Sequence, residues 1–353
     1  MKQRVNANMI ILARGSRGLN QKDLAEKLGV TQGTVSKIEN GEPVSEELLE
    51  KLAIVLQYPQ EFFFESAERY PPGINFYRKH NTLSKKELER IDAQIDIQRI
   101  HIQKLLQSAE VIANKIIQLD KDKYEYPEEA AQMIRENWLI PKGPINNLVN
   151  YIESTGIVVV FRDFGVYKFS AVSKFTDKLQ YIIFVNTNMS SDRMRFTLAH
   201  ELGHIVMHNI SISEFEVEAN AFAAEFLMPA RDIRHYLFDL DLQKLASLKR
   251  YWKVSMGSLI ERAYTLGTIT DRQRRYLWTK MSRLGYKKHE PPELDPPKES
   301  PQLLCKLINL HSNSLGYAVG ELSRLLALRT EEYMALYEPT KIDSGRKHLR
   351  VIK

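Results

Sequence analysis

The pattern of apolar and polar positions over residues 1–57 predicts four short helices packed together. The first is expected over about residues 7–14, before two glycines. Asn20, Thr31 and Ser45 stand where the N-caps of the next three helices are expected, because their side chains can accept hydrogen bonds from unpaired backbone N–H groups. The apolar positions expected in the shared core are Leu24, Leu28, Val35 and Ile38. Four capped helices of this length are typical of a helical DNA-binding domain.

A longer helix is predicted from Ser84 to about Leu119. Its apolar positions recur at alternating spacings of three and four residues, with one polar interruption. These positions are Leu88, Ile91, Ile95, Gln98, Ile102, Leu105, Ala109 and Ile112. The pattern favours packing within the chain, and contact between two copies in a homodimer is the alternative.

Strand-like patterns replace the helical ones between residues 143 and 190. Ile157–Phe161 and Tyr181–Val185 are runs of β-branched and aromatic residues bounded by turn-forming residues. Helical periodicity returns from Asp192 onward. The sequence therefore predicts a mainly α fold with a small β-sheet (α+β). Its expected parts are the helical domain (1–65), a helical connector (66–135), a larger body (136–288), an extended proline-rich linker (289–302) and a C-terminal helical module (303–353).

The composition is that of a globular protein, with 43% hydrophobic and 27% charged residues. The single cysteine, Cys305, cannot form an intrachain disulfide, so we expect a reducing, cytoplasmic location. The apolar run Met9–Ala13 is too short for a signal peptide or a membrane span, and no membrane partner is expected. Residues 1–38 hold seven Lys and Arg against two acidic residues, which fits phosphate contact on one face.

Residues 200–204 read HELGH and carry the candidate chemistry of the body. Histidines four residues apart lie on one helix face, so His200 and His204 can bind one metal ion. Glu201 lies beside that face and can take a proton from water as a general base. The strand at Tyr181–Val185 precedes this helix and could align a peptide substrate by edge pairing.

A catalytic metal needs a third protein ligand. Glu216 heads the next predicted helix and is the expected ligand, with Glu218 as the alternative. Asn220, one turn later, is expected to hydrogen-bond a ligand histidine. His208 is expected to pack or to face solvent. The donor types favour Zn²⁺, although another divalent metal is open. The side chains available to stabilise an oxyanion, without a ranking, are His235, Tyr236 and Tyr264.

Two segments resemble known families. Residues 18–41, GLNQKDLAEKLGVTQGTVSKIENG, resemble the helix-turn-helix of the XRE family, related to lambda-type phage repressors. Residues 195–208, RFTLAHELGHIVMH, and 216–229, EVEANAFAAEFLMP, resemble the ImmA/IrrE family of zinc metallopeptidases. The resemblances imply a lambda-repressor-like domain followed by a gluzincin-like metallopeptidase domain.

The XRE resemblance implies that Gln21 begins the positioning helix and that residues 31–40 form the recognition helix in the major groove. The expected base-contact residues are Gln32, Ser36 and Lys37, with Thr34 also counted among the DNA-binding residues. Gln21 and Asn40 fit phosphate contacts. Gly33 stands where relatives often carry a longer polar side chain, so the operator sequence is not predicted.

The ImmA/IrrE resemblance implies a zinc metalloendopeptidase that cleaves a repressor, often a helix-turn-helix protein, to switch stress-response or mobile-element genes. We therefore expect a DNA-binding regulator whose partners are a double-stranded DNA operator and a protein substrate. The alternative is a transcription factor whose inactive peptidase-like domain senses a ligand, metal or partner protein. The presence of Glu201 favours the enzyme. A third hypothesis is a toxin–antitoxin or phage-immunity component whose C-terminal module, after Pro301, binds a partner.

Overall fold

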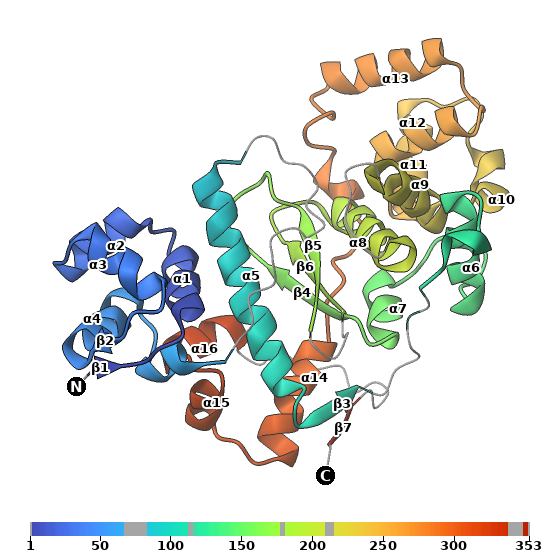
Figure 1. Ribbon diagram of the computed structural model, residues 1–353. Helices are drawn as coiled ribbons and strands as arrows, with labels where there is room; N and C mark the ends of the chain where they lie inside the picture. The colour runs from blue at the N-terminus through green and yellow to red at the C-terminus, as the bar shows by residue number, and fades with distance from the viewer. Residues whose placement is uncertain are drawn as a thin grey trace.

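The computed structural model describes residues 2–66, 83–111, 116, 118–176, 181–208, 215–337 and 349–351. In these residues, helices surround a three-stranded sheet, and two separate two-stranded sheets lie toward the edges of the molecule (Figure 1). The predicted fold class, mainly α with a small β-sheet, is confirmed. Within the same ranges, every helix is too short or too polar to reach across a membrane.

The N-terminal helices form as predicted. The elements are β1 (Lys2–Gln3), α1 (Ala7–Ser16), α2 (Gln21–Leu28), α3 (Gln32–Glu39), β2 (Val44–Ser45), α4 (Glu46–Leu56) and the 3₁₀ helix η1 (Gln60–Phe64). Asn20, Thr31 and Ser45 each accept a hydrogen bond, at 2.8, 3.2 and 3.3 Å, from the backbone N–H three residues later. All three predicted N-caps are therefore confirmed. Gly29 ends α2 with a φ of 69°, a conformation that glycine adopts without steric cost.

The long helix is shorter than the sequence predicts. Helix α5 covers Lys85–Leu105, and the chain then enters β3 (Ala109–Val111), which pairs antiparallel with β7 (Leu349–Val351). The prediction of a helix to about Leu119 is wrong because this pairing with a distant segment replaces helical hydrogen bonds. Ala109, predicted on the helix, lies in β3, and Ile112 lies outside the described residues.

Helix α5 is buried inside the chain. It packs against α1 and against α14 (Leu303–Asn309), and Figure 1 shows it between the N-terminal helices and the sheet. Four of its heptad-like side chains, Ile91, Ile95, Ile102 and Leu105, are fully buried. Packing within the chain is thus confirmed for these positions, and they are not available to a second copy.

The central sheet has the strand order β4-β6-β5. Strands β4 (Val158–Arg162) and β6 (Tyr181–Asn186) run parallel, and β5 (Ala171–Phe175) pairs antiparallel with β6. Because β6 has a partner on both sides, the expectation that it pairs with a substrate at an edge is wrong. The sequence did not predict β5, which is an edge strand.

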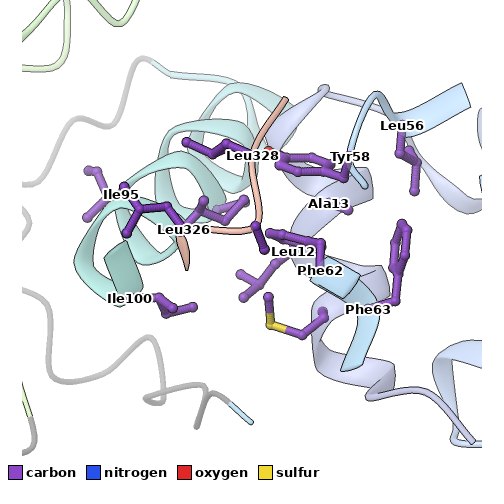
Figure 2. Packing of buried hydrophobic residues seen from close by; sticks show 14 of the residues in the cluster. Leu12, Ala13, Leu56, Tyr58, Phe62, Phe63, Ile95, Ile100, Leu326 and Leu328 are labelled. Atoms are coloured by element: carbon purple, nitrogen blue, oxygen red, sulfur yellow. The ribbon is translucent and has the colours of Figure 1, made fainter. Parts of the chain in front are cut away.

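Alternate side chains of this sheet enter two different cores, as the two-residue period of a strand dictates. One face, with Val160, Val172 and Phe184, joins a core that also holds α1, α5 and the C-terminal helices. The other face, with Val159 and Ile183, joins the core of the larger body. Figure 2 shows the first core, where Leu12, Ala13, Tyr58, Phe62, Ile95, Ile100, Leu326 and Leu328 come together.

The second core is built from helices. They are α6 (Pro127–Asn137), α7 (Leu148–Ser154), α8 (Ser191–Met207), α9 (Phe215–Leu227), α10 (Ala230–Ile233), the 3₁₀ turn η4 (Arg234–Tyr236), α11 (Leu242–Trp252), α12 (Met256–Thr265) and α13 (Asp271–Arg283). Helix α8 lies on the sheet and packs against α9. A side chain at Gly203 would come within 3.0 Å of the Phe222 ring, so glycine allows the two helices to approach closely.

The proline-rich segment at 289–302 forms one 3₁₀ turn, η5 (Pro292–Leu294), and no other helix or strand, and polar contacts fix it to the body. The buried Lys249 ammonium lies 2.6, 2.9 and 2.7 Å from carboxylate oxygens of Asp192, Glu290 and Asp295. Further along, Glu299 pairs with the buried Arg195. Residues 289–302 are therefore held at several points along their length.

The C-terminal helices return to the N-terminal domain. They are α14, the π turn at Leu310–Ser314, α15 (Val319–Leu325) and α16 (Thr330–Tyr337). The Arg17 guanidinium makes two hydrogen bonds of 2.9 and 3.0 Å to Glu332, and Arg329 donates to the Ala53 carbonyl at 2.8 Å. These helices therefore connect the N-terminal domain to the body.

Glu153 fixes the start of α14. Its carboxylate accepts hydrogen bonds from the backbone N–H groups of Gln302 at 2.8 Å and Leu303 at 3.0 Å. Burial raises the pKa of Glu153 to about 7, although these two hydrogen bonds oppose the rise.

This raised pKa predicts a pH-dependent stability. The folded chain holds the Glu153 proton more tightly than the unfolded chain, so its contribution to stability falls as the pH rises from about 4.5 to about 7. A Glu153→Gln variant has no such proton. Relative to the wild type, the free energy of unfolding of this variant should therefore increase by about 3 kcal/mol as the pH rises over this range. Urea unfolding at both ends of the range measures the difference, and a constant difference would contradict the prediction.

Candidate metal centre and DNA-binding face

Three potential ligands converge from two helices. The Nε2 atoms of His200 and His204, on α8, lie 3.1 Å apart. The Glu216 carboxylate, in the first turn of α9, lies 3.5 Å from Nε2 of His200 and 3.4 Å from Nε2 of His204. Both histidines are buried, with exposed fractions of 3% and 1%. Among the described residues, these three form the group that could hold a metal ion.

The donor set fits a divalent metal such as zinc. Two imidazole nitrogens and one carboxylate oxygen form a known ligand set of catalytic zinc. Tetrahedral ligands with bonds of 2.0–2.2 Å stand about 3.3–3.6 Å from one another, close to the three separations given above. Burial raises the pKa of Glu216, whereas its interactions with His200 and His204 lower it. The lowering is the larger effect, so the pKa of Glu216 lies well below its ordinary value. Glu216 is therefore ionised, as a ligand must be.

The other ring nitrogens of the two histidines have different partners. Nδ1 of His200 lies 3.1 Å from Oδ1 of Asn220, so the amide oxygen can accept an Nδ1–H and leave Nε2 free to bind a metal. Nδ1 of His204 lies 3.1 Å from Nδ1 of His208, whose Nε2 lies 3.0 Å from Oε2 of Glu218.

This second arrangement gives His208 and Glu218 roles that the sequence analysis missed. Burial lowers the pKa of His208 to about 4, so its ring is neutral and donates from one nitrogen. If Nε2–H donates to Glu218, then Nδ1 of His208 accepts from Nδ1–H of His204, which leaves Nε2 of His204 unprotonated. His208 packs, as expected, stacked on Phe215 at 4.1 Å. Its spacing of four from His204 was the sequence signal for this contact.

Glu201 lies between α8 and the sheet. Its side chain is buried, and the Ser173 hydroxyl donates a 2.5 Å hydrogen bond to its Oε2 atom. Ser173 belongs to β5, the edge strand next to α8. The arrangement holds a carboxylate adjacent to the ligand pair and beside a strand edge, where it can accept or deliver a proton.

The three side chains that the sequence offers for stabilising an oxyanion are in contact with other parts of the body. The Tyr236 ring is tilted against the His235 ring, with 3.9 Å between centroids, and approaches Trp252 edge-on, whereas the Tyr264 ring lies under the Arg274 guanidinium at 4.7 Å. These contacts are with residues other than His200, Glu201 and His204. We therefore assign no oxyanion-stabilising residue.

The DNA-contact candidates lie on an accessible helix. Gln32, Lys37 and Asn40 are exposed on α3, and Thr34 and Ser36 are half-exposed. The Asn40 amide nitrogen donates to the Ser36 carbonyl at 2.8 Å, which occupies one of its two N–H groups.

Gln21 is less available than its neighbours on α3. Its amide nitrogen donates to Glu39 at 2.7 Å, and Arg14 also pairs with Glu39 at 2.5 Å. The buried Glu39 thereby ties α1 and α2 to α3. A phosphate contact from Gln21 requires its second N–H or a change of partner.

Comparison with known proteins matches two parts of the chain. Residues 10–62 match the family model described as helix-turn-helix, and residues 152–264 match the one described as IrrE N-terminal-like domain. A curated relative, uncharacterized immunity region protein 2 of Bacillus phage phi105, is 32% identical over 84 residues. The match covers 20% of this chain and 49% of the relative, so it spans about half the relative's length. Both resemblances noted in the sequence are confirmed.

Proposed function

We propose that this chain, which joins an XRE-type helix-turn-helix domain to an ImmA/IrrE-like domain, is a DNA-binding regulator with zinc metalloendopeptidase activity. Its proposed substrate is a repressor, itself a helix-turn-helix protein, whose cleavage in the cytoplasm switches stress-response or mobile-element genes. The observation that carries the proposal is the convergence of His200, His204 and Glu216 beside the buried Glu201. The phage immunity-region relative supports the mobile-element setting.

In this mechanism, the residues of the chain position, activate and shield the reacting groups. A zinc ion held by His200, His204 and Glu216 would polarise the scissile carbonyl and lower the pKa of a water molecule. Glu201, oriented by Ser173, would take the proton of the attacking water and deliver it to the leaving amine. The substrate backbone would pair with the outer edge of β5, the edge opposite β6, which brings the scissile bond next to Glu201.

A second candidate function is favoured by the burial of the site. His200, Glu201 and His204 are each at most 3% exposed, and a protein substrate must reach them. A regulator that binds a metal or ligand here as a signal, without cleavage, needs no such access. The two functions differ in whether the Glu201 carboxylate is required.

Mapping of new protein N-termini in the native host tests the proposal. Cells would express the wild type or Glu201→Gln, with and without DNA damage. We expect a cut in a small DNA-binding protein that appears only with the wild type. Absence of any Glu201-dependent cut in both conditions would shift the assignment to the sensor.

The same experiment includes a DNA-binding variant, Gln32→Ala with Lys37→Ala. Loss of each base contact should weaken operator binding by about 1–3 kcal/mol, measured by electrophoretic mobility shift. If DNA recruits the peptidase to a DNA-bound substrate, the cut should weaken in parallel. Undiminished cleavage by a variant that no longer binds the operator would rule out recruitment and leave the peptidase assignment intact.

A further inference from the structure

A cleft of about 880 Å³ lies at the N-terminal end of α8, bordered by α12, α13 and the segment 286–295, which leads into the proline-rich segment. Its aromatic lining comes from Tyr167, Phe196, Trp278 and Tyr286. Its cationic lining comes from Arg193, Lys287 and Lys288. A volume of this size is typical of a site that encloses a ligand or a segment of a partner.

The cleft borders the same helix that carries His200 and His204, nearer its N-terminal end. Phe196 precedes His200 by four residues and Arg193 precedes it by seven, so both lie on the face of α8 that carries the ligands. Seven residues of helix span about 10.5 Å, which equals roughly three residues of extended peptide. Tyr167 lines the cleft just before β5 begins at Ala171. A peptide along β5 therefore leads toward the cleft.

The Trp278 ring forms a fixed apolar wall. Its Nε1–H donates to Glu261 at 2.7 Å, so the polar atom of the indole is satisfied outside the cleft. The ring packs directly on Gly257, where an added Cβ would lie 2.8 Å from it. Because Trp278 is only half-buried, part of the ring is available to an apolar side chain.

The exposed charge around the cleft is positive. Residues 271–289 contain seven Lys and Arg and one acidic residue, a net charge of +6 by subtraction, equal to that of the whole chain. Lys287 and Lys288 bring this charge to the cleft and are exposed.

The carboxylates that also line the cleft are occupied within the fold. Asp192, Glu290 and Asp295 all bind the Lys249 ammonium. Glu290 also accepts hydrogen bonds from the backbone N–H groups at the start of α12. The charge of these carboxylates is therefore partly compensated within the fold, whereas Lys287 and Lys288 are exposed to solvent.

We propose that this cleft is a recognition subsite for an acidic segment of the protein substrate, which lies within about three residues of the scissile bond and is anchored by one apolar side chain. The inference rests on the proposed peptidase function. It adds the chemical class of segment that the enzyme selects.

Peptide binding to the full-length Glu201→Gln variant tests this subsite without cleavage. One fluorescent peptide carries a phenylalanine between aspartates and glutamates, and its match carries asparagines and glutamines instead. By fluorescence anisotropy, the acidic peptide should bind about tenfold more tightly. Lys287→Glu with Lys288→Glu should remove this preference. The matched control, Arg272→Glu with Arg283→Glu, reverses two exposed charges on α13 outside the cleft lining and should retain it.

Equal binding of the two peptides would overturn the proposal, as would equal losses in the two charge-reversal variants. Tighter binding of a single-stranded oligonucleotide that depends on Lys287 and Lys288, without any preference for the acidic peptide, would assign the cleft to nucleic acid instead. Trp278→Ala should reduce affinity for the phenylalanine peptide more than for a peptide with alanine in place of the phenylalanine. A defect of the whole fold would reduce both affinities equally. If the wild type cleaves nothing but these binding differences hold, only the peptidase proposal fails.

Discussion

Replacing Glu201 with glutamine is expected to slow peptide-bond cleavage by about 10²–10⁴-fold, because the amide cannot accept the proton of the attacking water. Metal binding should be unchanged, since the proposed ligands are His200, His204 and Glu216. The Ser173 hydroxyl can still donate to the amide oxygen, so the local packing is preserved. The measurements are kcat/KM for cleavage of the repressor substrate and the metal content of the purified variant.

Ser173→Ala provides the control for orientation. It removes the hydrogen bond to Glu201 but keeps the carboxylate, so it should cost much less than Glu201→Gln. A Glu201→Gln variant that cleaves at the wild-type rate would show that Glu201 is not the base. Loss of metal in this variant would instead show that Glu201 contributes to binding the ion.

Glu216→Ala is expected to lower metal affinity by more than roughly 100-fold, because it removes one of three protein ligands. Two buried imidazoles would then face each other without the carboxylate. Competition with a chromophoric chelator measures the affinity directly, without reference to catalysis.

Glu218→Gln separates the two acidic residues of the first turn of α9. Its contact is with His208, not with the ligand group, so its effect should lie within the roughly 10–100-fold range of residues that orient a ligand. His208→Ala should match it, because both changes disturb the same nitrogen of His204. If Glu218→Gln lost more affinity than Glu216→Ala, the ligand assignment would have to be exchanged.

The features predicted well from sequence are those set by local spacing. N-caps depend on a side chain and a backbone N–H three residues away, and the approach of His200 to His204 depends on one turn of a helix. Asn20, Thr31 and Ser45 cap their helices for this reason. The family resemblances rest on the same short segments.

The features missed depend on distant partners. Strand β5 reads poorly as a strand because it contains Ser173 and Lys174, and both are buried only because remote residues receive them. Ser173 meets Glu201, and Lys174 lies 3.2 Å from Asp96 on α5. The early end of α5 likewise follows from pairing with Leu349–Val351, which no local pattern indicates.

The proline-rich segment shows the same division. Its prolines predict an extended backbone, and the structure forms no helix or strand there apart from a single 3₁₀ turn. Nothing local shows that Glu290 and Asp295 would reach a buried lysine on α11. Those contacts follow from how the helices stack.

The core shared by the N-terminal helices, α5 and the C-terminal helices has a consequence for action on DNA. A domain tethered by a flexible linker can take many orientations around the DNA. The body, packed in this way, keeps one orientation relative to the recognition helix. The body would then point to one side of the double helix, and neighbouring sites would return to that side once per turn, every 10–10.5 base pairs or so. Cleavage would then depend on the number of base pairs between the operator and the site of the DNA-bound substrate. A change in that spacing by half a helical turn would place the substrate on the opposite side of the DNA, out of reach.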